Sequence, residues 1–249
     1  MNVKKYIPNL LTLGNLLCGT IATIFAIKGD FFATAILVMT GIVFDFFDGF
    51  AARMLHVQGE LGKQLDSLAD MVTSGVVPGI VMMQLLINAL NVDAVGYFGI
   101  DMYGATGSNL PYIGLILTLG AGYRLAKFNI DERQSESFIG VPTPAMSLFV
   151  ISLPLIVEYA KDSFLVGLIL NPYFLIIITV LFTYLMNAEI PLFSLKFKNF
   201  SFKDNVIKYV FLALSVVLLV TLKIVAIPLI ILSYVVLSIV NNSDKRVSS

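Results

Sequence analysis

Apolar runs of about 20 residues follow one another along most of this chain of 249 residues. A helix of that length crosses the hydrocarbon core of a bilayer, which is about 30 Å thick. Hydrophobic residues make up 58% of the chain and charged residues only 13%, whereas a soluble domain of similar size carries about 25% charged residues. We therefore expect an all-α fold, a polytopic bundle of transmembrane helices.

Polar and glycine-containing breaks divide the apolar sequence into about eight predicted spans. Two divisions stay open, because Asn171 and Pro172 interrupt the sixth stretch and only Lys223 and Ile224 separate the last two. We assign residues 1–240 to a single transmembrane domain and residues 241–249 to a polar tail. The predicted spans are residues 8–27, 32–55, 63–90, 109–129, 143–160, 171–189, 205–222 and 225–240.

The distribution of basic residues predicts the orientation. Cytoplasmic loops of membrane proteins carry an excess of Lys and Arg. If the N-terminus is cytoplasmic, thirteen of the sixteen Lys and Arg lie on that side, and only Lys28, Lys161 and Lys223 lie on the other. We expect an integral protein of the cell membrane, inner or plasma, with both termini in the cytoplasm. The net charge of zero gives no reason to expect nucleic acid as a partner.

Four aspartates stand out because they lie inside or beside predicted spans. Asp45 and Asp48 are three residues apart, and Asp66 and Asp70 are four apart, so each pair shares one face of a helix. The turn near residues 58–62 brings the two helices together as an antiparallel pair. We therefore expect the four carboxylates to converge at the cytoplasmic end of the membrane.

Such convergence is unfavourable without a counter-charge. One aspartate at the centre of a bilayer costs about 2.5–3.5 kcal/mol, less near the interface, and neighbouring anions repel one another. Arg53 and Lys63 offset only part of that charge. Carboxylate oxygens are preferred ligands of Mg²⁺, Mn²⁺ and Ca²⁺, whereas zinc sites use Cys and His. The sequence predicts one or two such ions, with four ligands: Asp45, Asp48, Asp66 and Asp70.

The residues around these aspartates form the pattern Asp-Gly-x₂-Ala-Arg-x₈-Gly-x₃-Asp-x₃-Asp, from Asp48 to Asp70. Every position resembles the signature of the CDP-alcohol phosphatidyltransferases, and Asp45 completes the four-aspartate set. The resemblance implies an integral membrane enzyme that transfers a phosphatidyl group from a CDP-linked lipid to an alcohol and releases CMP. It also implies a homodimer, since many members of the family are dimers.

The start of the first span supplies further candidate contacts. Residues 8–15 resemble the part of this family that contacts the nucleotide-lipid. Helix caps would explain Asn9 or Thr12, but not Asn15, which lies deeper in the span. Small residues near the aspartates let helices approach closely and leave room for a ligand. We expect CDP-lipid contacts from Asn9, Thr12, Asn15, Gly49, Ala52, Arg53, Gly62 and Asp66.

Two further stretches, residues 124–129 and 138–144, resemble the membrane-integral phosphatidylserine synthases of this family. This resemblance implies CDP-diacylglycerol and L-serine as substrates. From the residues alone, Arg124 and Lys127 could hold the serine carboxylate, which Arg binds through two parallel hydrogen bonds. Both could equally be cationic anchors at the membrane surface. The candidate serine-binding residues are Arg124, Lys127 and Asn129.

Asp70 is the candidate catalytic base, which takes the proton of the serine hydroxyl as its oxygen attacks the β-phosphorus. The other three aspartates are mainly metal ligands, and Asp70 either contributes to a second metal or acts alone. The only histidine, His56, lies at a predicted helix end, and the only cysteine, Cys18, is expected to be a packed thiol. Because the two lie far apart in sequence, we expect direct displacement without a covalent intermediate.

Three alternatives stay open. Glycerol phosphate or inositol phosphate as acceptor would need several cations for its phosphate, and this loop offers only Arg124, Lys127 and Arg133. An intramembrane prenyltransferase also binds a diphosphate through two aspartate motifs, but those motifs lie farther apart and lack Asp-Gly-x₂-Ala-Arg. A transporter would place its acidic residues near the membrane centre beside broken helices, and the sequence around the aspartates predicts neither.

Overall fold

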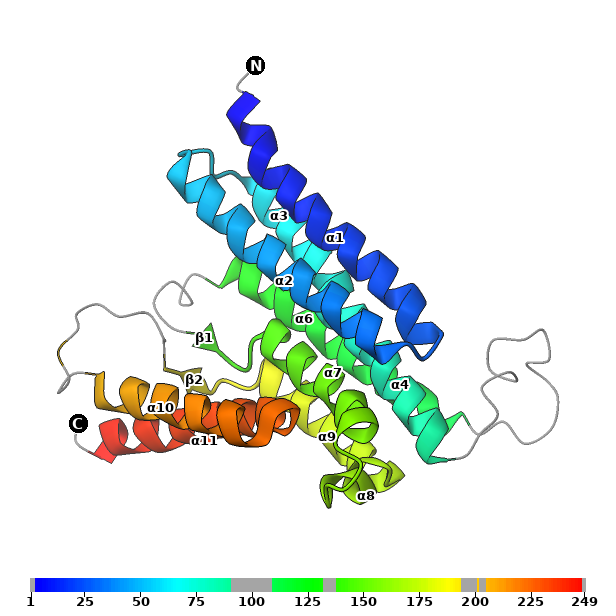
Figure 1. Cartoon of the computed structure of the whole chain (residues 1–249). Helices are drawn as coiled ribbons and strands as arrows, with labels where there is room; N and C mark the ends of the chain where they lie inside the picture. The colour runs from blue at the N-terminus through cyan, green and yellow to red at the C-terminus, as the bar shows by residue number, and fades with distance from the viewer. Residues whose placement is uncertain (1–2, 91–108, 132–137, 194–200, 202–204, 248–249) are drawn as a thin grey trace.

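Figure 1 shows the computed structural model of the chain, which describes residues 3–90, 109–131, 138–193, 201 and 205–247. Nearly all of these residues are helical. The strands among them are one short antiparallel pair, β1 (Phe138–Ile139) and β2 (Pro191–Leu192), in which Ile139 lies opposite Pro191. The expected all-α class is confirmed.

The N-terminal helices form a tight pair. A 3₁₀ turn, η1 (Val3–Lys5), leads into α1 (Tyr6–Ile27), which packs along α2 (Phe31–Met54). Asp30 caps α2, because its carboxylate accepts a hydrogen bond of 3.0 Å from the backbone N–H of Ala33. The acidic end of α2 therefore lies beside the start of α1.

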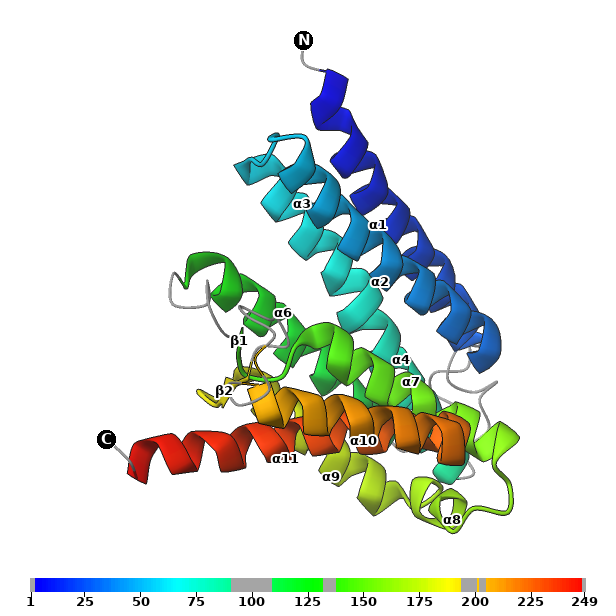
Figure 2. The same cartoon turned by 60° about the vertical axis from the view of Figure 1, so that its left-hand side comes forward.

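The third helical rod has three parts. It begins as α3 (Glu60–Asp70), continues as the π-helical segment η2 (Met71–Val76) and ends as α4 (Val77–Ala89). Two views show α1, α2 and α3 side by side (Figures 1 and 2). The π-helical segment is a departure from the regular span that the sequence predicts, and it starts directly after Asp70.

The middle of the chain forms the core. A 3₁₀ segment, η3 (Leu110–Leu115), continues into α6 (Ile116–Ile130), and α7 (Thr143–Tyr159) follows. α4 and α7 are the most deeply buried helices, since nearly every residue between Val77 and Ile87 is buried. α4 and α7 therefore form the centre of the core, and α1, α2, α6 and the later helices add buried apolar residues around them.

The sixth predicted span, residues 171–189, corresponds to α9 (Pro172–Asn187), and the apolar stretch before it forms a separate short helix, α8 (Leu165–Ile169). Asn171 explains the division, because its side-chain oxygen accepts a hydrogen bond of 2.9 Å from the N–H of Tyr173. An asparagine cap followed by proline at the first helical position is a strong start signal for a helix.

The C-terminal helices form a hairpin. α10 (Val206–Leu222) and α11 (Ala226–Val247) pack against each other, joined by the 3₁₀ turn η6 (Lys223–Val225). Lys223 has a φ of 51°, a left-handed conformation that allows the sharp reversal. α11 also packs on α7, and the Tyr234 hydroxyl donates a hydrogen bond of 2.8 Å to the Phe193 carbonyl.

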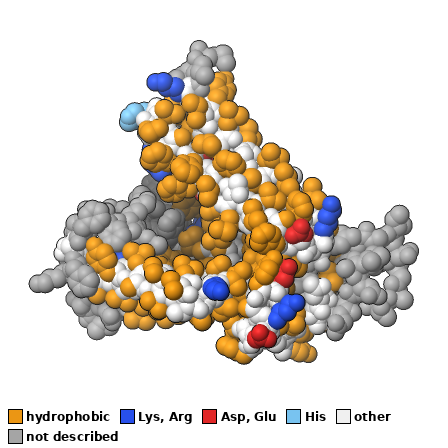
Figure 3. Space-filling model, in the orientation of Figure 1, with side chains coloured by type: hydrophobic (Ala, Val, Ile, Leu, Met, Phe, Trp, Pro, Cys, Tyr) orange, Lys and Arg blue, Asp and Glu red, His pale blue; other side chains and the backbone are white. Residues whose placement is uncertain are grey.

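Every predicted span corresponds to helical structure, and the apolar surface suits a bilayer. In the part of the chain that the structure describes, four stretches are long and apolar enough to cross a membrane: Tyr6–Ile27, Phe31–Met54, Glu60–Ala89 and Val206–Val240, the last of which contains the turn between α10 and α11. Two helices of similar character, α7 and α9, are shorter. Hydrophobic side chains cover the visible face, with charged side chains near helix ends (Figure 3). The chain is a polytopic helical membrane protein, and the number of spans stays a prediction.

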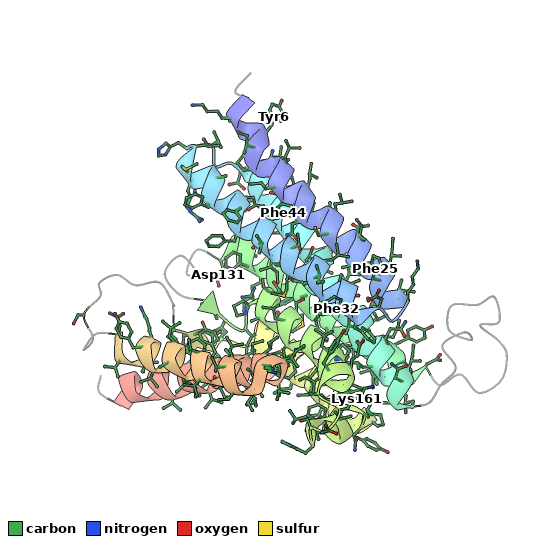
Figure 4. All side chains as sticks on the ribbon, viewed as in Figure 1. Tyr6, Phe25, Phe32, Phe44, Asp131 and Lys161 are labelled. Atoms are coloured by element: carbon green, nitrogen blue, oxygen red, sulfur yellow. The ribbon has the colours of Figure 1, made fainter. Side chains whose placement is uncertain are left out.

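The two ends of the bundle carry different residues. Tyr6 and Asp131 lie toward one end, whereas Phe25, Phe32 and Lys161 lie toward the other (Figure 4). The start of α1 and the end of α6 therefore lie toward the same end of the bundle, as do the acidic ends of α2 and α3.

Candidate active site

Three of the four predicted aspartates meet. Asp45 and Asp48 come from the last part of α2, and Asp66 comes from α3; α1 packs along both of these helices. One carboxylate oxygen of each lies within 4.8 Å of the others. Their spacing of three residues places Asp45 and Asp48 on one face of α2, and the shared contact with α1 brings Asp66 to that face.

The first helix holds one of these carboxylates. Asp48 is only 6% exposed. The Thr12 hydroxyl lies 2.5 Å from Asp48 Oδ2, to which it donates, and 3.1 Å from the Pro8 carbonyl. Thr12, predicted as a lipid contact, therefore fixes the position of a carboxylate in the acidic group.

Asp70 lies outside that group of three. Asn15 Nδ2, on α1, donates a hydrogen bond of 3.2 Å to Asp70 Oδ1. The charge of Asp70 also interacts with the cation of Arg124 on α6. Asp70 thus interacts with the charges of the acidic group on one side and with Arg124 of α6 on the other.

Glycines let the helices approach closely at this level. Thr73 is fully buried and its hydroxyl donates to the Asn15 carbonyl at 3.2 Å. A Cβ on Gly19 of α1 would lie 2.9 Å from the Thr73 Cα, and one on Gly41 of α2 would lie 2.7 Å from Asn15 Oδ1. Since Thr73 follows Asp70 by three residues, this packing also fixes the level of Asp70 between α1 and α2.

The remaining predicted lipid contacts lie around the acidic group. A Cβ on Gly62 would meet Asn9 Oδ1 at 3.6 Å, so the starts of α1 and α3 face each other. The exposed Arg53 folds back over Gly49, with its Nη1 at 3.4 Å from the position of an added Cβ. Ala52 is half-buried on the same helix.

The three predicted serine contacts have different surroundings on α6. Arg124 is 7% exposed, and its Nε and Nη2 have no hydrogen-bond partner in the described part of the chain. Lys127 forms an ion pair of 3.5 Å with Glu189. Asn129 Nδ2 donates a hydrogen bond of 2.9 Å to the Ser67 hydroxyl, and its carbonyl accepts from Lys63 Nζ at 2.6 Å. Arg133 lies outside the described residues.

The acidic group fits a divalent cation. Oxygens within 4.8 Å of one another can be bridged by one ion with bonds of about 2.0–2.6 Å. Asp66 Oδ1 is buried and has no hydrogen-bond partner among the residues described, a costly state for a carboxylate unless a cation is near. The group contains only aspartates, which favours hard cations over zinc. Asp45, Asp48 and Asp66 could therefore hold a metal ion.

Comparison with known proteins identifies the family. The model of the family described as CDP-alcohol phosphatidyltransferase matches residues 5–186, the greater part of the chain. The chain belongs to the CDP-alcohol phosphatidyltransferase family. The matched region of this family member contains α1 to α4, α6 to α8 and nearly all of α9, whereas α10 and α11 lie beyond it.

Curated members of the CDP-alcohol phosphatidyltransferase family are similar to this chain. A Bacillus subtilis protein named CDP-diacylglycerol–serine O-phosphatidyltransferase is 32% identical over 153 residues, which cover 60% of this chain and 75% of that protein. A Helicobacter pylori protein of the same name is 31% identical over 153 residues, 61% of this chain and 58% of that protein. Archaetidylserine synthase of Methanothermobacter thermautotrophicus is 26% identical over 171 residues, 66% of each chain.

Three features of the site could not be read from the sequence. Thr73 and Ser67 are hydroxyl residues in ordinary helical positions, and only the fold shows that they bond to Asn15 and Asn129. The π-helical segment has no composition signal. The third feature is the half-buried side chain of Asn187 at the end of α9, which bonds to the Gly120 carbonyl of α6. Nothing in the sequence around Asn187 indicates this contact.

Proposed function

We propose that this enzyme transfers the phosphatidyl group of CDP-diacylglycerol to the hydroxyl of L-serine, giving phosphatidylserine and CMP. The observation that carries the proposal is the complete signature from Asp48 to Asp70, folded so that three carboxylates meet and the charge of Asp70 interacts with both these carboxylates and Arg124. The three relatives described above have serine in their names, which supports serine as the acceptor.

The CDP end of the lipid lies against α1, α2 and α3. Asp45, Asp48 and Asp66 would hold one or two divalent ions, Mg²⁺ or Mn²⁺ with Ca²⁺ as a third candidate. When bound, such ions neutralise the diphosphate and stabilise CMP as the leaving group. Thr12 orients Asp48, and Gly49, Ala52 and Gly62 border the nucleotide. The exposed side chain of Arg53 supplies a cation for the phosphates. Asn9, at the start of α1, is a further contact with the CDP-lipid.

Asp70 acts as the general base. It takes the proton of the serine hydroxyl while the serine oxygen forms a bond to the β-phosphorus and the bond from that phosphorus to CMP breaks. Asn15 Nδ2 donates a hydrogen bond to Asp70 Oδ1, which leaves Asp70 Oδ2 for the substrate. If Asp70 also contacts a second ion, its carboxylate serves both tasks through different oxygens.

The serine end lies toward α6. Arg124 is the main carboxylate contact, because its buried guanidinium has unused donors. Lys127 and Asn129 are engaged with Glu189 and Ser67, so they take part only when these contacts open. Serine carries no phosphate, which agrees with a single buried cation at this position.

The proposal includes location and organisation. Residues 1–240 act as one transmembrane domain in the cell membrane, with the site at the cytoplasmic face, where serine and CMP are soluble. The lipid enters laterally between helices. A homodimer stays a prediction from the family resemblance.

One assay tests the proposed function. The purified protein, in mixed micelles with CDP-diacylglycerol, is supplied in turn with serine, glycerol phosphate and inositol phosphate, and CMP is measured. We expect CMP and phosphatidylserine with serine alone, loss of both with EDTA, and recovery with Mg²⁺ or Mn²⁺. CMP only with a phosphorylated alcohol would contradict serine as the acceptor. Transfer from a prenyl diphosphate, without CMP release from the CDP-lipid, would contradict the reaction itself.

A further inference from the structure

Buried polar atoms without a hydrogen-bond partner gather around α6. Within the described residues they include Nε and Nη2 of Arg124, Oδ1 of Asn187 and the hydroxyls of Ser74 and Ser147. α6 contacts each of the elements that carry the other three residues, η2, α7 and α9. Proteins pair nearly all of their buried polar groups, so such a set indicates a place that a polar ligand completes. Ser74 lies one helical turn beyond Asp70, which puts this set next to the base.

The side chain of Asn187 is fixed against α6, one helical turn before Arg124. Asn187 ends α9, and its Nδ2 donates to the carbonyls of Gly120 at 3.1 Å and Thr183 at 2.9 Å. Gly120 lies one turn before Arg124 on the same face of α6. Side chains four residues apart on a helix are neighbours, so Arg124 lies on the face of α6 against which the amide of Asn187 packs. The guanidinium of Arg124 also lies over the Phe128 ring, 6.0 Å from its centroid.

These two hydrogen bonds also determine which atom Asn187 leaves for a ligand. An amide nitrogen has two hydrogens, and both are used on backbone carbonyls. A flipped amide would place its oxygen against two carbonyl oxygens. The remaining polar atom is therefore the acceptor Oδ1, and Arg124 on the same face of α6 has an unused Nε and Nη2.

A buried donor cation next to a buried neutral acceptor complements a zwitterion. We propose that Arg124 and Asn187 together select the acceptor alcohol, with Arg124 binding the carboxylate of serine and Asn187 Oδ1 accepting a hydrogen bond from its ammonium group. The inference rests on the proposed function and adds Asn187 as a specificity-determining residue. An amide suits this position better than a carboxylate, because an aspartate there would pair with Arg124 and compete with the substrate.

The pairing explains how other alcohols are rejected. Ethanolamine lacks the carboxylate and would leave Arg124 buried without an anion. Glycerate has the carboxylate and the hydroxyl but no ammonium, and would leave Asn187 Oδ1 without a charged donor. A site built to hydrogen-bond a substrate group discriminates strongly against an analogue without that group, because its own buried polar atoms stay unpaired.

The test compares acceptors in Asn187→Ala. CMP release is measured with serine, glycerate and ethanolamine at saturating CDP-diacylglycerol. We expect the serine-to-glycerate ratio of kcat/KM to fall roughly 10- to 100-fold, the range for a lost hydrogen bond to a charged group. The serine-to-ethanolamine ratio and the KM for CDP-diacylglycerol stay as in the wild type. Arg124→Gln should give the opposite pattern, with the serine-to-ethanolamine ratio reduced.

Two further variants separate recognition from packing. Asn187→Thr keeps a hydroxyl that can bond to the Thr183 carbonyl, as Thr20 does to the Leu16 carbonyl, but it has no amide oxygen. It should therefore show the same fall in the serine-to-glycerate ratio, and it replaces Asn187→Ala in the test if the alanine variant is unstable. Thr183→Ser removes a methyl group packed against Gly120 at the same junction and should keep wild-type ratios. Unchanged ratios in both Asn187 variants, with a lowered melting temperature, would assign Asn187 a packing role only and overturn the inference. If the wild type releases no CMP with serine, the proposed function fails first and the inference falls with it.

Discussion

At the scale of single residues, the contact between Thr12 and Asp48 tests the metal site. Thr12→Val is nearly isosteric but removes the hydroxyl that donates to Asp48 Oδ2 at 2.5 Å. Groups that orient a metal ligand typically change metal affinity or activity by about 10- to 100-fold. We expect the concentration of Mg²⁺ or Mn²⁺ for half-maximal CMP release to rise by that factor, measured by metal titration after EDTA treatment.

The matched control for this prediction lies on the same helix. Thr20→Val removes an exposed hydroxyl that donates only to the Leu16 carbonyl, so its metal titration should match that of the wild type. Equal metal requirements in the Thr12 and Thr20 variants would mean that Asp48 needs no help from α1 and would argue against its role as a ligand.

Asp70 should be separable from the other aspartates. Asp70→Asn keeps an oxygen that can accept the hydrogen bond from Asn15 but removes the base. General-base catalysis contributes about 10²- to 10⁴-fold, so we expect kcat to fall within that range while binding of CDP-diacylglycerol, followed by fluorescence or calorimetry, is retained. Asp162→Asn, in the exposed loop after α7, is the control. Normal turnover by Asp70→Asn would refute the base assignment.

At the scale of helices, the close contact of α1 with η2 maintains the site. The Cβ of Gly19→Ala would lie 2.9 Å from the Thr73 Cα, so relief requires a backbone shift and not only a side-chain rotation. Overpacking of this kind costs about 1–3 kcal/mol. We expect a lower melting temperature and reduced CMP release, because Asn15 and Asp70 move apart.

Gly167→Ala is the matched glycine control. Gly167 lies in α8, and an added Cβ there meets no atom within 4 Å, so melting temperature and activity should stay as in the wild type. A Gly19→Ala protein with unchanged stability and activity would show that α1 and η2 are not in close contact in the membrane.

The helices and the acidic cluster were predictable because they depend on local patterns. Apolar run lengths gave the spans, and spacings of three and four residues placed the aspartates on common faces. The partners of Lys127 and Asn129 were not predictable, since Glu189 and Ser67 lie about 60 residues away in sequence and meet only through packing. The π-helical segment Met71–Val76 was missed because a run of apolar and small residues fits either helix type.

At the scale of the whole molecule, antiparallel connections bring distant segments to one end of the bundle. The start of α1, the end of α2, the start of the third rod and the end of α6 all lie there, and each contributes site residues. The C-terminal hairpin lies beyond the region that matches the family, and its contact with α7 suits support of the core. The polar end of the bundle thus carries the site that acts on the lipid headgroup, and the apolar helices anchor the protein in the bilayer.

The orientation of this polar end is the last prediction. Cys18 is the only cysteine and is buried, so Cys18→Ala gives a background for single cysteines at two exposed loop positions, Gln58→Cys beside the site and Lys161→Cys at the opposite end. The distribution of basic residues predicts that Gln58 lies in the cytoplasm. In intact cells a membrane-impermeant maleimide should label Lys161→Cys alone, and Gln58→Cys should react only after permeabilisation. Both variants must retain CMP release. If only Gln58→Cys were labelled in intact cells, the site would lie outside the cytoplasm and the predicted orientation would be wrong. The site would then also be separated from the reactions that make serine and the CDP-lipid.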